Sequence, residues 1–254
     1  MNIETLGSYK VIARVGAGAL GELYRGRDAP RGRTVTIETL PASLAADLDR
    51  RAGFVREANA SRVLSHPNVA SLHEVGEASG QMFLVFDAVP AQTLLAAIGG
   101  QPMNMRRAVQ LGVEIADALA EAHAHGILHR CLKPTSVIVS TQGNAKVLDF
   151  GLGSWLGDQA IRPADAAYMS PEQRRNETLD ERSDIFTLGA VLIEMLTGTP
   201  PPVTRPLPSE FRRLAAKAMA EDRDARYQSA AGLAADLRAA MDAIEARRSA
   251  SERR

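Results

Sequence analysis

The chain has 254 residues, 45% of them apolar, which is enough to bury a sizeable core in one domain or in two packed lobes. Lysine plus arginine and aspartate plus glutamate both number 30, so the net charge gives no indication of a nucleic-acid partner. The single cysteine excludes an internal disulfide, and no apolar run approaches the roughly 18 residues of a membrane span. Because the N-terminus also lacks a basic-then-apolar leader, we expect a cytoplasmic protein.

The first part of the chain predicts a small β-rich lobe. Short β-branched runs separated by turn residues predict strands, and a 3–4 apolar spacing predicts one helix that ends before His66-Pro67. The predicted strands are 9–15, 22–26, 34–40, 70–75 and 82–86, and the predicted helix is 45–64. Residues 87–91 would then form a hinge.

Beyond this hinge the pattern becomes helical. Residues 106–125 carry an amphipathic spacing that ends at Gly126, and residues 183–196 are nearly all apolar, as in a buried core helix. Residues 208–220 and 228–247 complete the predicted helices.

Between the first two of these helices, residues 127–151 predict a hairpin with a polar loop on either side. Val137–Val139 and Lys146–Leu148 are β-branched or apolar runs around the turn residues Ser140–Asn144. One loop precedes the first strand and one follows the second, so both deliver polar side chains to the same end of the hairpin. This geometry suits a site for a phosphate and a metal.

These two loops resemble the catalytic and metal-binding loops of protein kinases, whose pattern is H-R-D-L-x-x-x-N followed by D-F-G. From about Tyr9 to Ala239 the chain is similar to a bacterial serine/threonine protein kinase domain. The other matching residues are Gly16, Gly18 and Gly21 of the glycine-rich loop, Glu57 of the helix called αC, Tyr168–Glu172 at the end of the activation segment, Asp184 and Arg226.

The resemblance implies an α+β, two-lobed fold. The N-lobe would cover residues 1–89 and the C-lobe residues 90–247, followed by a charged tail at 248–254. It also implies structural roles for residues that the chain retains. Asp184 would accept hydrogen bonds from the backbone of the His129–Arg130 loop, Glu172 would pair with Arg226, and His129 and Phe150 would pack.

The chemistry that the resemblance implies is altered at the third strand. Val35-Thr36-Ile37-Glu38 aligns with V-A-I-K, so Glu38 replaces the lysine that bridges the nucleotide phosphates to Glu57. Two unit charges about 4 Å apart at an effective dielectric near 20 cost on the order of 4 kcal/mol. Either αC moves away, or one carboxylate takes a proton or recruits a cation, or Glu38 turns to solvent.

The catalytic loop is altered as well. Cys131 replaces the catalytic aspartate, and Ser136 replaces the asparagine that holds the second magnesium; Asp149 and Lys133 are retained. A thiol with a reference pKa of about 8.5 is mostly neutral at pH 7, although His129 and Arg130 could lower that pKa. Asp149 alone would have to hold a metal.

The nucleotide pocket is predicted to be narrow. By alignment Leu23 and Thr36 form its roof, Ile138 its floor and Phe86 its gatekeeper, and the first two are larger than the family's valine and alanine. Added atoms on facing sides of a slot for a flat ring oppose entry. We expect no cofactor, or weak binding of ATP with Mg²⁺ or Mn²⁺.

Two further departures concern the C-lobe. Between Asp149 and Glu172 the hydroxyls are Ser154, Tyr168 and Ser170, and Asp165 stands where the family has a threonine. We expect Asp165 to pair with Lys133 and to lock this segment without phosphorylation. After Thr197-Gly198 the proline-rich 199–207 is too short for the family's αG helix, which either exposes part of the preceding helix or leaves a loop over the gap.

These losses favour a pseudokinase, a kinase-like domain that acts as a scaffold or allosteric signalling module. Its partner would be another protein, for example an active kinase. The alternatives are an unconventional kinase that uses Lys133 and Asp149, and a switch that binds nucleotide without transfer. Glu38, Glu57 and Asp149 could also converge to bind a divalent cation without nucleotide.

Overall fold

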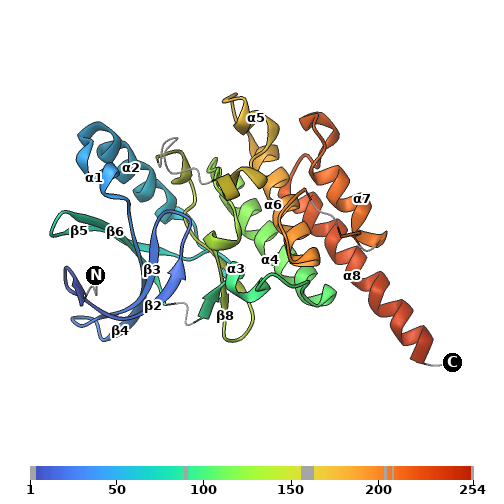
Figure 1. Ribbon diagram of the computed structural model, residues 1–254, viewed down its shortest axis with the longest axis horizontal. Coiled ribbons are helices and arrows are strands. Elements are labelled where there is room, and N and C mark those ends of the chain that lie inside the picture. Colours follow the sequence, from blue (N-terminus) through green and yellow to red (C-terminus); the bar gives the residue numbers. More distant parts are fainter. Residues whose placement is uncertain (1–3, 89–90, 156–162, 203–204, 208, 253–254) are drawn as a thin grey trace.

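The computed structural model describes residues 4–88, 91–155, 163–202, 205–207 and 209–252, arranged as a sheet lobe and a helical lobe side by side (Figure 1). The sheet lobe is antiparallel, with strand order β1-β2-β3-β4-β6-β5. Its strands are β1 Thr5–Leu6, β2 Tyr9–Ala17, β3 Glu22–Asp28, β4 Arg33–Thr39, β5 Leu72–Ala78 and β6 Gln81–Asp87. Apart from the short edge strand β1, these are the five predicted strands.

The helix predicted at 45–64 is broken into three pieces, α1 Ala42–Ala46, α2 Leu48–Ala60 and the 3₁₀ turn Ser61–Val63. Asp47 causes the first break, because it is extended and its carboxylate accepts hydrogen bonds from the backbone N–H groups of Asp49 and Arg50. This is an N-cap, which starts α2 afresh at Leu48.

The helical lobe holds the predicted long helices with small shifts at their ends. Its helices are α3 Leu94–Ile98, α4 Met105–Ala124, α5 Pro171–Arg174, α6 Glu181–Thr197, α7 Ser209–Ala218 and α8 Ala230–Glu252. The short α3 and α5 were missed, since each is too short to show an apolar period. Helix α8 runs beyond the other helices toward the C-terminus (Figure 1).

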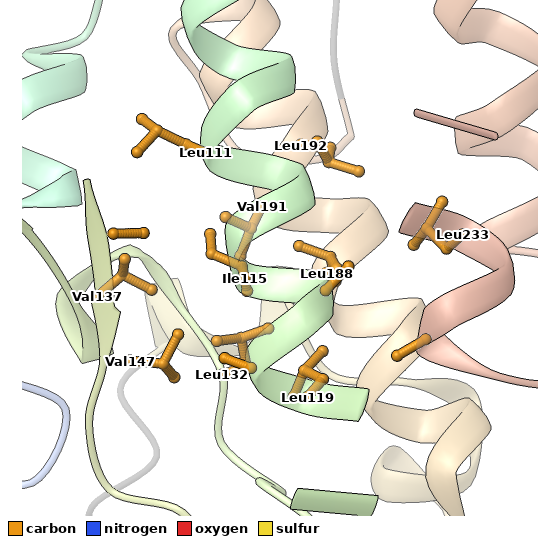
Figure 2. Close-up of a cluster of buried hydrophobic side chains, with 14 of the residues drawn as sticks. Leu111, Ile115, Leu119, Leu132, Val137, Val147, Leu188, Val191, Leu192 and Leu233 are labelled. Atoms are coloured by element: carbon orange, nitrogen blue, oxygen red, sulfur yellow. The ribbon is translucent and has the colours of Figure 1, made fainter. Parts of the chain in front are cut away.

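The core of this lobe lies between α4, α6, α8 and the hairpin. Figure 2 shows Ile115 and Leu119 of α4 beside Leu188 of α6, with Leu233 of α8 beyond them, whereas Leu111 of α4 points to the opposite side of that helix. Gly112 permits this close packing, because a Cβ there would lie 2.5 Å from Leu192 Cδ2.

The predicted hairpin is confirmed as β8 Val137–Ser140 and β9 Ala145–Val147, joined by β7 Ala91–Thr93 into a second sheet. This sheet contacts both lobes. Val137 and Val147 belong to the core of the helical lobe, whereas Ile138 and the following Leu148 pack with the sheet lobe. The loops on either side of the hairpin therefore lie where the two lobes meet.

The expectation that a missing helix would expose α6 is wrong. No helix occurs in the described residues between Thr197 and Ser209, yet α6 is buried from Ser183 to Thr197. The intervening loop covers the gap, since the Arg205 guanidinium donates to the Thr197 carbonyl at 3.2 Å and Leu207 packs on the core. In the part of the chain that the structure describes, no helix is long and apolar enough to span a membrane.

Candidate functional site

Glu38 lies on the central strand β4, directly under the loop between β2 and β3. Its side chain is fully buried, so it does not turn to solvent. Glu38 Oε1 accepts hydrogen bonds from the backbone N–H groups of Leu20 at 2.9 Å and Gly21 at 3.1 Å. The loop thus binds an internal carboxylate through its backbone amides, as such loops bind an anion.

The glycines of this loop allow it to lie close on β4. A Cβ at Gly18 would lie 2.1 Å from Glu38 Oε1, and one at Gly21 would lie 1.8 Å from the carbonyl oxygen of Thr39. The loop also closes on itself, since the Gly18 N–H donates to the Gly21 carbonyl at 2.6 Å. No side chain could be added at either glycine without moving the loop away from the strand.

The carboxyl group of Asp149 lies close enough to Glu38 for the charge of Glu38 to raise its pKa. Glu38 Oε2 and both Asp149 carboxyl oxygens are buried, and no N–H or hydroxyl of the described residues donates to them. Burial, together with the charge of the neighbouring carboxyl, raises the pKa of Asp149 well above its usual range, and burial raises the pKa of Glu38. Two buried carboxyls in contact are satisfied when one proton lies between them.

The Cys131 thiol does not become a reactive thiolate. It lies 3.7 Å from His129 Nδ1, but the protein packed around it and the nearby Asp149 carboxyl raise the pKa of the thiol. Burial also lowers the pKa of His129 to about 4, so that its ring is neutral and supplies no charge to the cysteine. The expectation that His129 could lower the Cys131 pKa is wrong.

Ser136 uses its hydroxyl to close a local turn. Ser136 Oγ donates to the Lys133 carbonyl at 2.8 Å and accepts from the Lys133 N–H at 3.1 Å. The residue is fully buried, and this reciprocal pair starts the 3₁₀ turn that leads into β8. Its oxygen is thus held by backbone groups of its own segment.

The predicted contact between Lys133 and Asp165 is present. Lys133 Nζ lies 2.8 Å from Asp165 Oδ2, and both side chains are nearly buried. The pair joins the loop before β8 to the turn at Pro163–Ala167. The lysine ammonium is therefore neutralised by the chain itself.

The residues that contact Glu57 of α2 differ from those that contact Glu38. Its carboxylate accepts a hydrogen bond from Trp155 Nε1 at 2.7 Å and lies 3.4 Å from the Arg130 guanidinium. Glu38, Glu57 and Asp149 thus do not converge, and the described residues contain no group of three or more His, Cys, Asp or Glu side chains placed to hold a metal. The expectation that these three carboxylates could together bind a divalent cation is therefore wrong.

The residues predicted to line a nucleotide pocket lie in the interior. Leu23, Thr36, Phe86 and Ile138 are at most 3% exposed. Three of them, Leu23, Phe86 and Ile138, belong to one apolar cluster of the sheet lobe. These three side chains thus belong to the packed interior of the sheet lobe.

The contacts predicted to hold the scaffold together are present. Asp184 accepts the backbone N–H groups of His129 at 2.8 Å and Arg130 at 2.9 Å. Arg226 makes a buried bidentate pair with Glu172, at 2.6 and 2.9 Å. The rings of His129 and Phe150 pack at a tilt of 52°, with centroids 4.9 Å apart.

A profile of the protein kinase domain matches residues 9–235. The chain belongs to the protein kinase family. The serine/threonine-protein kinase PknB of Mycolicibacterium smegmatis is 35% identical over 263 residues, covering 90% of this chain and 42% of its own. The probable serine/threonine-protein kinase PknB of Lactococcus lactis is 37% identical over 200 residues, covering 76% of this chain and 32% of its own. The chain thus spans less than half the length of these relatives.

Solved kinase domains share the fold. The Mycobacterium tuberculosis PknI kinase domain aligns with a TM-score of 0.77 at 23% identity, covering 94% of this chain and all of that one. The expected two-lobed α+β kinase fold is therefore confirmed.

Kinase domains use ATP with Mg²⁺ or Mn²⁺, and the residues of this kinase domain do not fit that group. The backbone amides that would face phosphate already bind Glu38, and the lysine that would pair with the phosphates is replaced by this acidic residue. Asp149 is turned to Glu38, and Ser136 is held in its own turn. These contacts leave the reaction no ammonium, proton acceptor or second metal ligand in the expected places.

The activation segment of this kinase domain is held by its hydroxyls. Tyr168 is buried and donates to the Glu194 carboxyl, and Ser170 is buried and caps α5 through the Gln173 N–H. The structure describes the segment at 149–155 and 163–172, and the predicted hydroxyl of Ser154 lies outside the described side chains. Of the predicted hinge, residues 89 and 90 lie outside the described residues, as do residues 253 and 254 of the predicted tail.

Proposed function

We propose that this kinase domain is a pseudokinase that acts as a scaffold or an allosteric signalling module. One observation carries the proposal: the Glu38 carboxylate accepts the Leu20 and Gly21 N–H groups that would otherwise face the phosphates of ATP. A nucleotide would have to displace a buried carboxylate that belongs to the fold. Nucleotide binding is therefore weak or absent.

The substitutions around the loop before β8 support the same proposal. A neutral Cys131 accepts no proton from a substrate hydroxyl, and the Lys133 ammonium is paired with Asp165. Residues that act as a unit in one reaction do not fail additively, so the loss of several leaves little transfer. The proposed site is thus a remnant, with Glu38, Cys131 and Ser136 at its degenerate positions.

The proposed partner is another protein, such as an active kinase, in the cytoplasm. The relatives are named as serine/threonine kinases, and a kinase fold without transfer retains surfaces on which another protein could act. Net charge of zero and the lack of a basic excess give no support to a nucleic-acid partner.

Two alternatives make different predictions. An unconventional kinase would use Lys133 and Asp149 at displaced positions, which requires the Lys133–Asp165 and Glu38–Asp149 contacts to break. A nucleotide switch would bind ATP without transfer, which requires only that Glu38 leave the glycine-rich loop.

A thermal-shift titration with ATP, with and without Mg²⁺ or Mn²⁺, tests nucleotide binding. We expect no saturable shift at micromolar ATP. A radiolabelled-ATP assay against the Asp149→Ala variant tests transfer, and we expect equal background labelling from both proteins. Saturation without transfer would establish the switch, and labelling that disappears in Asp149→Ala would establish the kinase; either result overturns the pseudokinase.

A further inference from the structure

The sole tryptophan of the chain, Trp155, lies against helix α2. Its indole Nε1 donates to Glu57 Oε2 at 2.7 Å, and the Arg50 guanidinium donates to the Trp155 backbone carbonyl. Arg50 and Glu57 are both in α2, so the two bonds tie this helix to the segment that follows Asp149-Phe150-Gly151. Neither bond was predicted from the sequence.

Gly53 makes room for the indole between these two bonds. A Cβ at Gly53 would lie 2.0 Å from Trp155 Cη2, far inside van der Waals contact. Glycine inside a helix costs about 1 kcal/mol relative to alanine. Here the missing Cβ is what lets the ring pack on α2. Gly53 and Trp155 are thus matched in shape although 102 residues separate them.

The tryptophan also determines where Glu57 points. Glu57 has donors on the side of the activation segment, the Trp155 indole and the Arg130 guanidinium, whereas β4 offers it the carboxylate of Glu38. Because a carboxylate is stabilised by hydrogen-bond donors and destabilised by a second carboxylate, these donors favour the observed direction.

We propose that Trp155 is a latch, formed with Arg50, Gly53 and Glu57, that holds α2 against the activation segment and keeps Glu57 turned away from β4. The latch is a second closure of the cleft, separate from the Glu38 carboxylate under the glycine-rich loop. Restoring a positive charge at position 38 would then not suffice to restore the ion pair with Glu57. The test by nucleotide affinity rests on the proposed function, whereas the test of the latch by fluorescence does not.

The first test uses the fluorescence of Trp155, which has no background from another tryptophan. We expect Gly53→Ala to expel the indole, shifting the emission to the red and increasing quenching by iodide. Gly232→Ala is the matched control, because it adds the same Cβ in helix α8 with no atom nearer than 3.4 Å. Glu57→Leu, which removes the acceptor and adds no atom at Gly53, should give the same red shift. Unchanged emission in both Gly53→Ala and Glu57→Leu would overturn the latch.

The second test measures Mg²⁺-ATP affinity in a double-mutant cycle. We expect Gly53→Ala to tighten binding about tenfold in a Glu38→Lys background and to have no effect with Glu38 in place. Equal affinity of Glu38→Lys with and without Gly53→Ala would overturn the latch as a barrier. Tight binding by the unaltered protein would instead overturn the proposed function, and the fluorescence test would still decide whether the latch exists.

Discussion

At the scale of single residues, the replacement of a positive side chain by the acidic Glu38 has the largest effect on the candidate site. Glu38 is buried beneath backbone amides and beside another carboxyl, and it takes the place of a lysine in the family pattern. Two backbone hydrogen bonds offset part of the cost of its burial, and the raised pKa values of Glu38 and Asp149 favour a proton on one of the two carboxyls. Instead of repelling the groups around it, Glu38 thus holds the loop between β2 and β3 against β4.

A Glu38→Gln variant tests the shared proton. The folded protein holds a proton on carboxyls that are ionised above about pH 4 when unfolded, so stability falls as the pH rises through the raised pKa values. An amide at this position donates to Asp149 without that proton. We expect Glu38→Gln to lose less stability than the unaltered protein between pH 5 and pH 8.

Urea denaturation at pH 5 and pH 8 measures this difference. Glu22→Gln, on the neighbouring strand β3 and partly exposed, is the control that should keep the original pH slope. An equally steep loss of stability in Glu38→Gln would mean that the two carboxyls do not share a proton.

A second prediction at this scale concerns the buried pair of Arg226 and Glu172. Although burial opposes the charged form, hydrogen bonds from Arg226 and Ser183 lower the pKa of Glu172 to about 2. The pair therefore stabilises the fold above the usual glutamate pKa, and this contribution is lost as the pH falls toward 2. We expect Arg226→Met to cost about 3–5 kcal/mol in urea denaturation at pH 7, and less at pH 3. A cost that does not decrease at pH 3 would contradict this account.

At the scale of elements, side-chain contacts hold the short 3₁₀ turns on either side of the hairpin in place. The turn at Pro163–Ala167 is fastened by Asp165 to Lys133, and the turn before β8 is closed by Ser136. In each case a residue that departs from the kinase pattern makes an internal contact. These internal contacts therefore hold the elements around the candidate site in place.

We expect Asp165→Ala to destabilise the protein by about 3 kcal/mol, because it leaves the Lys133 ammonium buried without its carboxylate. Chemical denaturation would measure this loss of stability. Hydrogen-exchange measurements should in addition show faster exchange at 163–167. The double variant Lys133→Met with Asp165→Ala is the control, and it should recover part of the loss. An Asp165→Ala protein with unchanged stability and exchange would show that the pair does not fasten this segment.

At the scale of the whole molecule, packing and chemistry depend on different residues. The core formed by α4, α6 and α8 contains apolar side chains, whereas the altered positions lie in loops and on β4. The site could therefore lose its kinase residues while the two-lobed fold remained.

Helix α8 gives a prediction about this core. Leu237 is fully buried between α8 and α4, but Met241, one turn later, is only partly buried. We expect Leu237→Ala to cost about 2–5 kcal/mol and Met241→Ala about 1 kcal/mol, as urea denaturation would measure. Equal costs would show that the second half of α8 contributes as much to the core as the first half.

The sequence predicted the parts of this molecule that are local. Amphipathic spacing placed α4 and α8, a nearly continuous apolar run placed α6, β-branched runs placed the strands, and ordered motifs indicated the kinase fold. The contacts of Asp184, of Glu172 with Arg226 and of Lys133 with Asp165 also followed from the motifs. These predictions depend on the spacing of apolar residues or on fixed positions in a known motif. Both can be read from a single sequence.

The sequence by itself thus determined the family, the order of the elements and the identity of the altered site residues. Only the tertiary structure decided that Glu38 turns inward, that Asp149 faces it, and that Glu57 binds Trp155 and Arg130. The reason is physical: a buried carboxylate can be satisfied by an amide, a proton or a cation, and only the packing of distant segments determines which donor comes within reach.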